Sequence, residues 1–552
     1  MQLKKTISLL GVVLTITPAL LFSQINNRST SEVTITIIED DTHQITPAML
    51  CITGLKDNLP RVPPYAEEAQ VLVMTDSIYY SGIDYKADKN WFGPVRKMSG
   101  LGNNLDRSYV YELRPSIAYW KEPVMYQTSG NFKVNFPPGK WKISIEHGNE
   151  YIPINEIISV DSGTKELSKT FVLKRWINLP FRGWYSGDVH VHHPTTKQSF
   201  KDYLLAYAKA EDLHLINILE QGNDHEIRGA RQAGFGKKFR ELKNNIWLVS
   251  GQEDPSSIFG HVIGLNIDQL VRDTGTYNYY DLVFEKLRLQ PGAIVGFAHF
   301  SWNGCDLPRG FPWLVTTKQI DFVELLQFSK INTLDYYDYL NLGFRLTAAA
   351  GSDFPWGSTI GEVRTLAYTG NNFNADTWFA ALKAGNTFVT NGPALFFKAS
   401  GKMPGTEITT TKGNTIELKV KALSNKSIGV ISHLSIYNND GVIAEVKNPF
   451  HSDSISISFS HTLTKSQWIA AAVCCDNGAV AHTTPVYCIV DCQPTWDKEK
   501  APGIIQKQLT AIDATEKEEK EKEKVDTGIL TRLSDARIFY RKFLKEINGM
   551  QD

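Results

Sequence analysis

The sequence predicts a mixed α/β protein, with a β/α barrel in the middle of the chain and a β-sandwich on either side of it. Two patterns predict this fold class. Within residues 179–393, short apolar runs alternate with segments of helical composition, which is typical of strands covered by helices. Residues 31–178 and 394–495 instead contain runs that alternate apolar and polar residues, which is typical of strands with one buried face. A chain of 552 residues is long enough for several hydrophobic cores.

Residues 1–23 are typical of a secretory signal peptide. Lys4 and Lys5 precede a mostly apolar run over residues 7–22, and Ser23 provides a small residue at its end. The run is too short to favour a membrane span, and no later segment is apolar enough to form one. An uncleaved N-terminal anchor is the alternative. We therefore expect an exported protein, in a periplasm or outside the cell, whose mature chain has no membrane span.

Residues 31–178 predict the first sandwich. Residues 32–38 (EVTITII) alternate at a period of two, and residues 131–136 and 140–145 are two further alternating runs. A Pro-Pro-Gly turn separates the last two runs, which indicates a hairpin. Such hairpins with one buried face per strand favour a β-sandwich.

Residues 179–393 contain seven apolar runs, which suit a closed β/α barrel better than an open sheet. Their alternation with helical segments predicts parallel strands with the helices outside. The runs cover residues 188–191, 213–219, 246–249, 261–265, 293–298, 320–326 and 346–350. The expected helices cover residues 200–211, 228–243, 279–289 and 333–342.

Residues 394–495 predict the second sandwich, because residues 415–420 (TIELKV) and 454–459 (SISISF) again alternate. Residues 496–552 form a charged tail with helical spacing.

Four of the six cysteines lie close together, at Cys474, Cys475, Cys488 and Cys492. Two strand-like runs, residues 468–474 and 486–490, could lie side by side. Because export favours oxidation, a disulfide between these two runs is a hypothesis. No pair of CxxC motifs is present, so a cysteine-based zinc site is not supported.

The composition excludes several classes of function. Lys and Arg number 58 against 59 Asp and Glu, so the net charge is −1 and no overall basic field attracts nucleic acid. Hydrophobic residues make up 42% and charged residues 21%, which excludes a wholly disordered chain or a coiled-coil rod.

Residues that bind metals gather at the ends of the predicted strands in the central region. Seven of the 13 histidines lie between His190 and His299, and an HxH pair in extended chain presents both imidazoles on one face. The strand ends of a parallel barrel meet at one rim, and imidazole and carboxylate are ligands of Zn, Mn or Fe. The sequence therefore predicts a metal site. The candidates are His190, His192, His225, Glu253, His261, His299 and Asp353.

Each candidate taken alone also has a structural interpretation. A single histidine at a strand end is often only a hydrogen-bonding residue, and an acid after glycine often caps a turn. The shared placement is what favours a metal site. Asp188 is expected to bond a neighbouring imidazole or to brace its turn. Glu324 is equally consistent with a salt bridge at the rim, and His193 and His214 are expected to be structural.

Residues 184–192 (WYSGDVHVH) resemble the opening motif of the PHP superfamily of metallohydrolases, named after polymerase and histidinol phosphatase. The order HxH, DH, GxE, GH, AH and GSD within residues 185–370 resembles the carbaryl-hydrolase-like (CehA/McbA) group in particular, and so do residues 481–487 (AHTTPVY). The resemblance implies a hydrolase with a distorted (β/α)7 barrel and two or three metal ions.

The resemblance also implies which residues bind each metal. Glu253 would bridge two ions. The first would also bind His190, His192 and Asp353, and the second would bind His261 and His299.

The positions for a third metal depart from the family pattern. No acid follows the HxH pair, although His193 could substitute, and Pro355 stands where a histidine is expected. We therefore expect two divalent ions, Zn or Mn with Fe as a further candidate, and His225 as a substrate-facing residue or weak ligand.

Two metals that share Glu253 imply hydrolysis by a bridging hydroxide, with His225 or His299 assisting proton transfer. Arg364 is expected at the rim, where it would bind an anionic substrate. Trp302 and Trp356 follow two ligand motifs, and they either wall the pocket or only pack there.

The leading hypothesis is an exported metal-dependent hydrolase that cleaves a phosphoester. The same site could cleave a carbamate, an ester or an amide. A non-catalytic cell-surface binding protein with a degenerate site is a second class of function. The expected partner is a small-molecule or ester substrate, whereas the natural substrate and the oligomeric state stay open.

Overall fold

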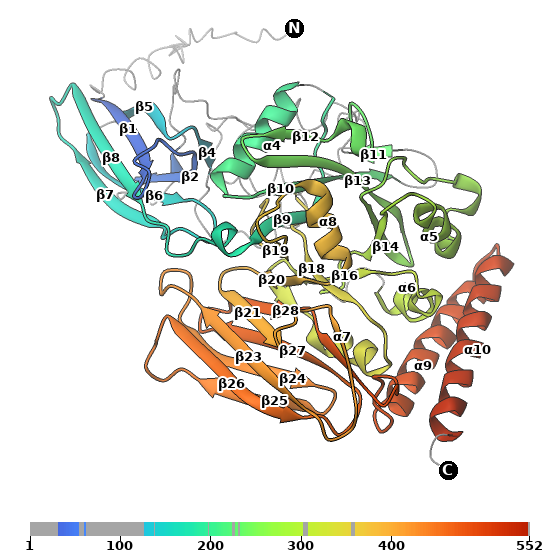
Figure 1. Ribbon diagram of the computed structural model, residues 1–552. Coiled ribbons are helices and arrows are strands. Elements are labelled where there is room, and N and C mark those ends of the chain that lie inside the picture. The colour runs from blue at the N-terminus through green and yellow to red at the C-terminus, as the bar shows by residue number, and fades with distance from the viewer. Residues whose placement is uncertain are drawn as a thin grey trace, which may run out of the picture.

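The computed structural model describes residues 31–54, 60–61, 126–136, 138–196, 198–222, 227–229, 232–301, 307–354 and 359–549. Figure 1 shows a small β-sandwich at one end, a central mixed sheet with helices, a second β-layer below it and a pair of long helices along one side. The expected signal peptide lies outside the described residues. Among the helices that the structure describes, none is both long enough and apolar enough to cross a membrane.

The N-terminal region consists of two small sheets that share one core. One sheet has the strand order β5-β1-β8, and the other has the order β3-β2-β6-β7 with β4 paired to β2. Alternate residues of β1, among them Val33, Ile35 and Ile37, are fully buried between the sheets. The strands are β1 (Ser31–Glu39), β2 (Ala48–Gly54), β3 (Pro60–Arg61), β4 (Tyr126–Thr128), β5 (Asn131–Phe136), β6 (Gly139–Glu146), β7 (Ile154–Val160) and β8 (Glu166–Leu173).

The central region is built on a large mixed sheet. Strands β9, β10 and β13 are parallel, and so are β15, β16 and β18, as the sequence predicts. The strands are β9 (Trp184–Val191), β10 (Leu215–Gly222), β11 (Ile227–Gly229), β12 (Glu241–Lys243), β13 (Ile246–Ser257), β14 (Gly260–Leu265), β15 (Ile294–Phe297), β16 (Phe322–Gln327), β17 (Lys330–Ile331), β18 (Thr347–Ala350), β19 (Arg364–Tyr368) and β20 (Thr387–Thr390).

The expectation of parallel strands is wrong at β14, and β19, which was not among the expected runs, is antiparallel as well. β14 is antiparallel to both β13 and β15, and β19 is antiparallel to β9 and β20. Only residues 258–259 separate β13 from β14. A parallel connection needs a crossover of about a dozen residues, so this link can only form a hairpin.

Three of the four expected helices form. They are α4 (Gln198–Ala210), α5 (Tyr280–Arg288) and α7 (Thr333–Asn341), to which the structure adds α6 (Leu307–Leu314) and α8 (Ala375–Lys383). The expected helix over residues 228–243 is wrong, because this segment contains β11, β12 and a 3-10 turn at Lys237–Phe239. Gly236 precedes that turn with φ 93°, a conformation that does not continue a helix.

The segment after β18 lies along the end of β9. The Asp353 N–H donates to the His190 carbonyl at 2.8 Å, and the His192 N–H donates to the Phe354 carbonyl at 2.7 Å. The Thr365 hydroxyl accepts from the Ala350 N–H at 2.7 Å and so ties β19 to β18. These bonds place Asp353 directly beside the HxH pair.

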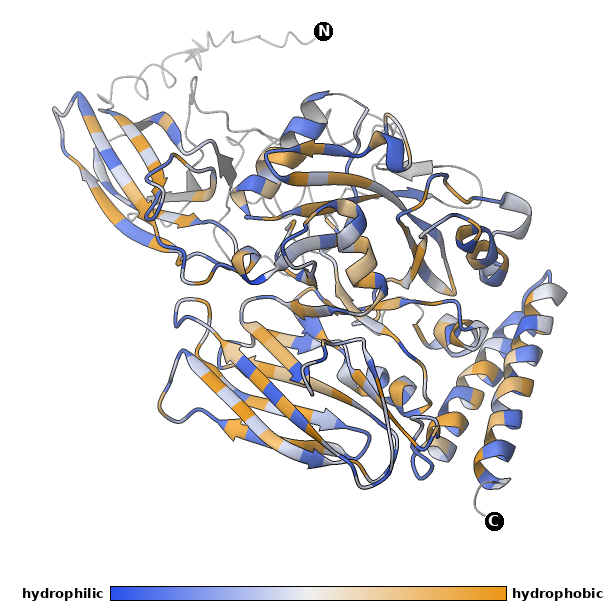
Figure 2. Ribbon diagram, in the orientation of Figure 1, coloured by the Kyte–Doolittle hydropathy of each residue, from blue (hydrophilic) through white to orange (hydrophobic). Residues whose placement is uncertain are grey.

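The C-terminal β-region has two layers around a second core. One layer is the antiparallel sheet β21-β23-β26, and the other continues the large sheet through the pairing of β20 with β28. Figure 2 shows alternating hydrophilic and hydrophobic residues along these strands. The strands are β21 (Ala394–Ala399), β22 (Glu407–Thr410), β23 (Thr415–Leu423), β24 (Ile431–Asn438), β25 (Gly441–Lys447), β26 (Ser454–Thr462), β27 (Gln467–Cys475), β28 (Val480–Thr483) and β29 (Val486–Val490).

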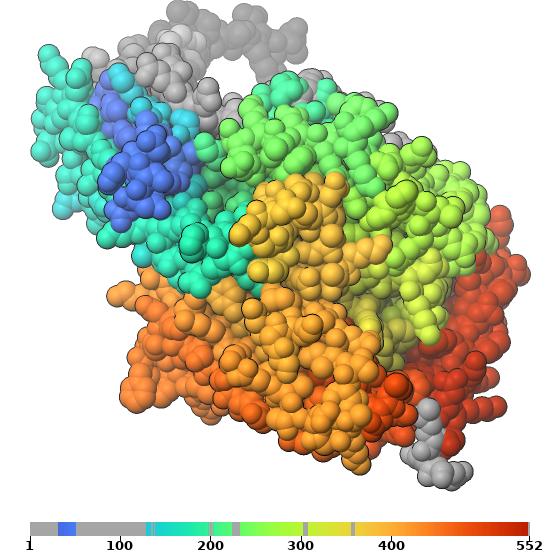
Figure 3. Space-filling view, viewed as in Figure 1, coloured from blue at the N-terminus to red at the C-terminus, as the bar shows by residue number. Residues whose placement is uncertain are grey.

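The chain ends in an antiparallel pair of helices, α9 (Ala501–Lys520) and α10 (Thr527–Gly549). They bury one apolar face, which includes Leu533, and the Tyr540 hydroxyl donates to the Pro312 carbonyl of α6 at 2.8 Å. Figure 3 shows this pair against the side of the central and C-terminal regions. The charged tail therefore docks on the body through its apolar face.

The disulfide hypothesis is wrong. The two strand runs do pair, as β27 and β29, but the register places Gln467 opposite Cys488, whereas Cys474 lies opposite Val480. Cys474, Cys475, Cys488 and Cys492 are all free thiols. The offset between the strands, which the sequence does not reveal, keeps the sulfur atoms apart.

Candidate metal centre

The predicted ligands come together at one edge of the central sheet. His190 lies near the end of β9, His299 lies just beyond β15, and Asp353 follows β18. His261 is the second residue of β14, so it lies at the start of its strand and not at the end. Because β14 runs antiparallel to its neighbours, its first residues lie at the edge where the neighbouring strands end. The hairpin thereby brings His261 next to Glu253 of β13.

The Glu253 carboxylate lies between four imidazoles and is fully buried. Its Oε1 lies 2.9 Å from His261 Nδ1, 3.1 Å from His299 Nε2 and 3.3 Å from His190 Nε2. Its Oε2 lies 3.2 Å from His192 Nε2. One carboxylate thus uses both oxygens to contact every histidine of the predicted ligand set except His225, which lies outside the described residues.

Asp353 completes the first predicted ligand group. Its Oδ1 lies 3.4 Å from Nε2 of both His190 and His192, and these two nitrogens are 3.0 Å apart. Two neutral imidazoles with their lone pairs facing each other at this distance repel, unless a cation or a proton lies between them. The donor set therefore fits a divalent ion of the Zn, Mn or Fe type.

The potential ligand atoms form two groups that match the two expected ions, and a third that overlaps both. His190, His192 and Asp353 form one group, and Glu253, His261 and His299 form another. Within each group the ligand atoms lie within 4.8 Å of one another. The third group is His190, His299 and Glu324. Glu253 also contacts the histidines of the first group, which is the arrangement expected of a carboxylate shared by two metals.

Three of the histidines have their second ring nitrogen held by an acceptor. Nδ1 of His192 lies 3.0 Å from the Leu219 carbonyl, and Nδ1 of His190 lies 2.9 Å from Glu324 Oε1. Nδ1 of His299 lies 2.9 Å from Gln327 Oε1. Since a carbonyl or carboxylate oxygen only accepts, each Nδ1 carries a proton, which leaves Nε2 as the ring nitrogen that can bind a metal.

Asp188 braces the backbone around the site and contacts no imidazole ring in the described hydrogen bonds. Its Oδ1 accepts from the N–H groups of His190 at 3.0 Å and Ser352 at 2.9 Å, and its Oδ2 accepts from Gly361 N–H at 3.1 Å. Of the two roles expected for Asp188, the structure therefore supports the bracing of the turn. Burial raises the pKa of its carboxyl to about 6.

The electrostatics of the cluster favour positive charge. Within the described part of the chain, no Lys or Arg forms an ion pair with Glu253, Glu324 or Asp353. Burial lowers the pKa of His299, but the hydrogen bond to Glu253 and the charge of Asp353 outweigh burial and raise this pKa to about 9. Burial raises the pKa of Glu253, but the charges of His190 and His261 hold it well below its ordinary value.

Two ligand positions have strained backbone, and a nearby glycine is required by space. His299 has φ 59° and Asp353 has φ 54°, a left-handed conformation that residues with side chains seldom adopt. Such strain concentrates at functional sites. A Cβ atom at Gly351 would lie 2.5 Å from Glu324 Oε1 and 2.5 Å from the Cβ of His190. The glycine of the GSD motif thus lets β18 approach β9.

The expectation that Arg364 lies at the rim of the site is wrong. Its side chain is 2% exposed, and its guanidinium donates to the Gly361 carbonyl and to the carbonyl and carboxylate of Glu211. Successive side chains of a strand point to opposite faces. The Thr365 side chain hydrogen-bonds to Ala350 of β18. Because Arg364 is the neighbouring residue on β19, its side chain points to the face opposite that of Thr365. His225, Trp302 and Trp356 lie outside the described residues.

His193 and His214 are both buried and lie outside the groups of potential ligand atoms. Nδ1 of His193 lies 2.8 Å from the Pro194 carbonyl, and Nδ1 of His214 lies 3.0 Å from the Ser186 hydroxyl. Burial lowers the pKa of each imidazole to about 4.

Sequence reasoning missed two glutamines that contact the cluster. Gln327 holds His299, and Gln221 donates from Nε2 to Glu253 Oε2 at 2.9 Å. The only feature of the sequence that could have identified these glutamines is their position just after a predicted strand, because no sequence motif marks a glutamine that holds a ligand. The role of Glu324 was also left open between a ligand and a salt bridge at the rim, and the structure shows its buried carboxylate 2.9 Å from His190 Nδ1.

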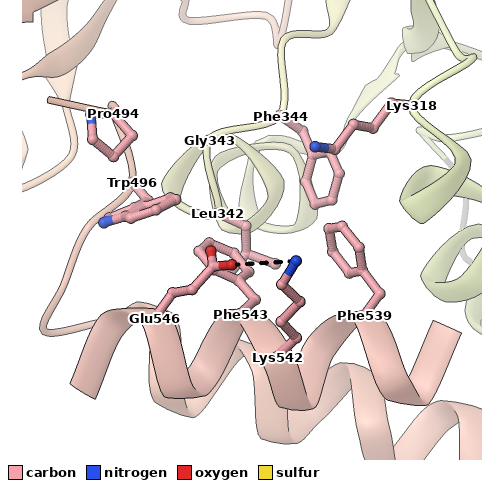
Figure 4. Close-up of a pocket in the computed structure, with 10 residues that line it drawn as sticks. All are labelled: Lys318, Leu342, Gly343, Phe344, Pro494, Trp496, Phe539, Lys542, Phe543 and Glu546. Carbon is pink, nitrogen blue, oxygen red and sulfur yellow. Dashed lines mark ion pairs between the residues drawn. The ribbon is translucent and has the colours of Figure 1, made fainter. Parts of the chain in front are cut away.

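One described pocket lies away from the cluster. It has a volume of about 270 Å³ and is formed by α10, the turn after α7 and the segment that precedes α9 (Figure 4). Its walls include the rings of Phe344, Trp496, Phe539 and Phe543. It shares no residue with the metal-ligand groups.

No protein-family model and no curated protein matches this sequence. Among solved structures, PsfC from Pseudomonas syringae PB-5123 matches 36% of this chain and 90% of its own, with 17% identity and a TM-score of 0.26. The fibronectin(III)-like modules of Clostridium thermocellum CbhA match 17% of this chain and 96% of their own, with 18% identity and a TM-score of 0.13. The CARDB domain of Pyrococcus furiosus PF1109 matches 18% of this chain and 96% of its own, with 22% identity and a TM-score of 0.13.

Proposed function

We propose that this chain is an exported metal-dependent hydrolase of the PHP superfamily, of the carbaryl-hydrolase-like group, with two divalent ions and a phosphoester substrate. The observation that carries the proposal is the buried Glu253 carboxylate, which both imidazole groups contact. Export and family membership rest on the N-terminal sequence and on the ordered motifs.

The proposal treats the large mixed sheet as a distorted (β/α)7 barrel of residues 179–393, with β-sandwiches at residues 31–178 and 394–495. The bonds between His190, His192 and the segment 353–354 support this view, because they join the two ends of the strand order. The antiparallel strands β14 and β19 account for the distortion.

Each ligand has a separate role. One ion would be held by His190, His192 and Asp353. The other ion would be held by His261 and His299, and Glu253 would bind both ions. Two divalent ions bound there would supply a nucleophilic water at neutral pH and polarise the substrate's phosphoryl or carbonyl oxygen. The chain's own part is to keep the Nε2 lone pairs of His190, His192 and His299 turned inward through their Nδ1 partners.

His299 is a ligand in this proposal and does not transfer protons. Its Nε2 faces Glu253 and its Nδ1 faces Gln327, so both ring nitrogens are engaged. Proton transfer to the leaving group is then assigned to His225. Arg364 is withdrawn as a substrate ligand because its guanidinium is buried against Glu211.

A phosphoester is preferred over a carbamate because of the pairing of the two ligand groups. A two-metal site stabilises both the attacking and the leaving oxygen of an in-line displacement at phosphorus. Two neighbouring groups that share a carboxylate provide that symmetry.

The test compares an aryl phosphate with an aryl carbamate that release the same phenol. We expect the metal-loaded chain to cleave the phosphate faster, and Asp353→Asn to abolish cleavage. Asp513→Asn, an exposed carboxylate on α9 that pairs with Arg537, is the matched control and is expected to retain the rate. Faster cleavage of the carbamate would reassign the substrate, and cleavage of neither ester by a chain that holds two ions would contradict the hydrolase.

A further inference from the structure

We propose that Glu324 and Gln327 act as one positioning unit that fixes a histidine at each metal position and so links the two positions. This inference rests on the proposed binuclear function, and it concerns residues that the expected ligand set does not include. Both side chains are fully buried on β16.

The unit is a chain of four hydrogen bonds. Glu324 Oε1 accepts from His190 Nδ1 at 2.9 Å. Glu324 Oε2 accepts from the His299 backbone N–H at 2.8 Å and from Gln327 Nε2 at 3.0 Å. Gln327 Oε1 in turn accepts from His299 Nδ1 at 2.9 Å. One carboxylate and one amide therefore connect His190 of the first ligand group to His299 of the second.

The backbone of β16 is adapted to this arrangement. Residues three apart on a regular strand point to opposite faces of the sheet. The pairing of β16 with β18 shifts register between Glu324 and Leu326, an irregularity of the kind that re-aims side chains in a sheet. The shift lets Glu324 and Gln327 meet on one side, and Gly351 leaves the space that the Glu324 carboxylate fills.

The bonds fix proton positions in sequence. An ionised carboxylate only accepts, so Glu324 requires a proton on His190 Nδ1 and turns the NH2 group of Gln327 toward itself. The Gln327 oxygen must then face His299, which requires a proton on His299 Nδ1. Both imidazoles are thereby held in the tautomer whose Nε2 can bind a metal.

The same bonds argue against Glu324 as a metal ligand, although its carboxylate forms a potential group with His190 and His299. Its two oxygens already meet three donors. Metal binding there would require His190 to give up its Nδ1 proton.

Replacing Glu324 by glutamine removes one of the two acceptor oxygens and changes the side-chain volume little. An amide has one acceptor oxygen, so its NH2 group must face at least one of the three donors. We expect Glu324→Gln to weaken metal binding at both positions by about 10–100-fold, the usual cost of losing an outer partner of a ligand. Gln327→Ala should weaken mainly the position of His299.

The exchange of the two side chains provides a rescue. In Glu324→Gln/Gln327→Glu, the carboxylate at position 327 can accept from His299 Nδ1 and from the amide at position 324. We expect the second position to regain most of its affinity relative to Glu324→Gln. If the two side chains only packed, the losses of metal affinity caused by the two single substitutions would add in the exchange variant.

The experiment is a calorimetric titration of the metal-free mature chain with Zn²⁺ or Mn²⁺ alone. Glu150→Gln and Gln508→Ala are the matched controls, because both side chains are buried and hydrogen-bonded away from the cluster. Thermal unfolding of each metal-free variant establishes that it folds. Weakening of both positions in Glu324→Gln, of one in Gln327→Ala, and recovery in the exchange variant are the expected results.

Three results would overturn the inference. Equal affinities in the wild type and in Glu324→Gln would remove the positioning role alone. A third ion that disappears in Glu324→Gln would make Glu324 a ligand. A wild-type chain that binds no metal while folded would overturn the proposed function and this inference with it.

Discussion

Two buried charged clusters of this protein balance their charges in different ways. In the Arg175 cluster, which consists of Arg175, Glu150 and Asp212, the guanidinium lies 2.7 Å from the Glu150 carboxylate and 2.9 Å from that of Asp212. In the metal-ligand cluster, the charged or ionisable partners of Glu253 and Asp353 within the described part of the chain are all imidazoles, and Glu253 also accepts from the neutral Gln221 amide. Arg175 is permanently charged, whereas a histidine is charged only when it is protonated.

The difference shows which cluster balances its buried charge with its own side chains. A buried carboxylate requires a compensating charge or a proton. The Arg175 cluster has one cation for two carboxylates. Burial and the charge of Asp212 accordingly raise the pKa of Glu150 to about 8, so that Glu150 keeps a proton. This cluster joins the N-terminal sandwich to the segment before β10 and needs no ligand. The metal-ligand cluster must take up protons or a metal, so it is the cluster whose charge balance can depend on a bound ion.

The largest expected effect removes the shared carboxylate of the metal-ligand cluster. Glu253→Gln should release both ions and lower hydrolysis by more than the roughly 100-fold that an outer partner costs. Elemental analysis and the rate on the aryl phosphate measure the two effects. Glu150→Gln removes a carboxylate of similar burial from the Arg175 cluster and is the control. An equal loss of metal in that variant would contradict the claim that only the metal-ligand cluster binds metal.

The next effect is one of stability. Arg175→Met removes the cation that pairs with both Glu150 and Asp212, and we expect it to lower the free energy of unfolding by about 3 kcal/mol. The value is at the lower end for a buried pair because Arg175 is 16% exposed. Denaturant unfolding measures it. The metal content should not change, and a loss of metal would show that the two clusters are coupled.

Chelation is expected to affect only the metal-ligand cluster. An ion that binds the folded chain alone stabilises it by about 2.7 kcal/mol at one hundred times its Kd. A chelator should therefore lower the Tm of the wild type and of Arg175→Met alike, and leave His190→Ala nearly unchanged. A wild-type Tm that is insensitive to chelation would contradict metal binding in the folded state.

The effect that is smallest over a single pH unit is a pH dependence that belongs to the Arg175 cluster. Because the pKa of Glu150 is raised above its unfolded value, the folded chain holds a proton that the unfolded chain releases. Stability from this group is present at low pH and is lost as the pH rises toward about 8, with a slope of at most about 1.4 kcal/mol per pH unit. Glu150→Gln should flatten the slope of unfolding free energy between pH 5 and pH 8, and an unchanged slope would assign it to other groups.

Much of the metal-ligand cluster could be predicted from the sequence, because five of its six described residues stand at or just beyond the end of an apolar run. His190, His192, Glu253, His299 and Asp353 all do so. The antiparallel course of β14 was not predicted, yet it explains why His261 opens its run instead of ending it. Local patterns thus found the residues that the fold brings together, although they did not give the direction of every strand.

The residues that sequence reasoning missed or misplaced depend on partners distant in the chain. Arg364 bonds to Glu211 across the sheet, and the charge of its side chain alone suggested the rim. Gln327 holds His299 only because β16 shifts its register against β18. Cys474 and Cys488 lie on paired strands whose offset keeps them apart. Register and tertiary contacts are the properties that one sequence does not display.

The most direct test of the central claim is the metal content of residues 24–552, the chain expected after removal of the signal peptide. After growth with added Zn and Mn and after dialysis, elemental mass spectrometry counts the ions in the wild type, in His190→Ala and in the matched Arg175→Met. We predict about two ions per chain in the wild type and in Arg175→Met, and a clear loss in His190→Ala. A folded wild-type chain with close to no bound metal would contradict the claim that the Glu253 cluster is a binuclear metal centre.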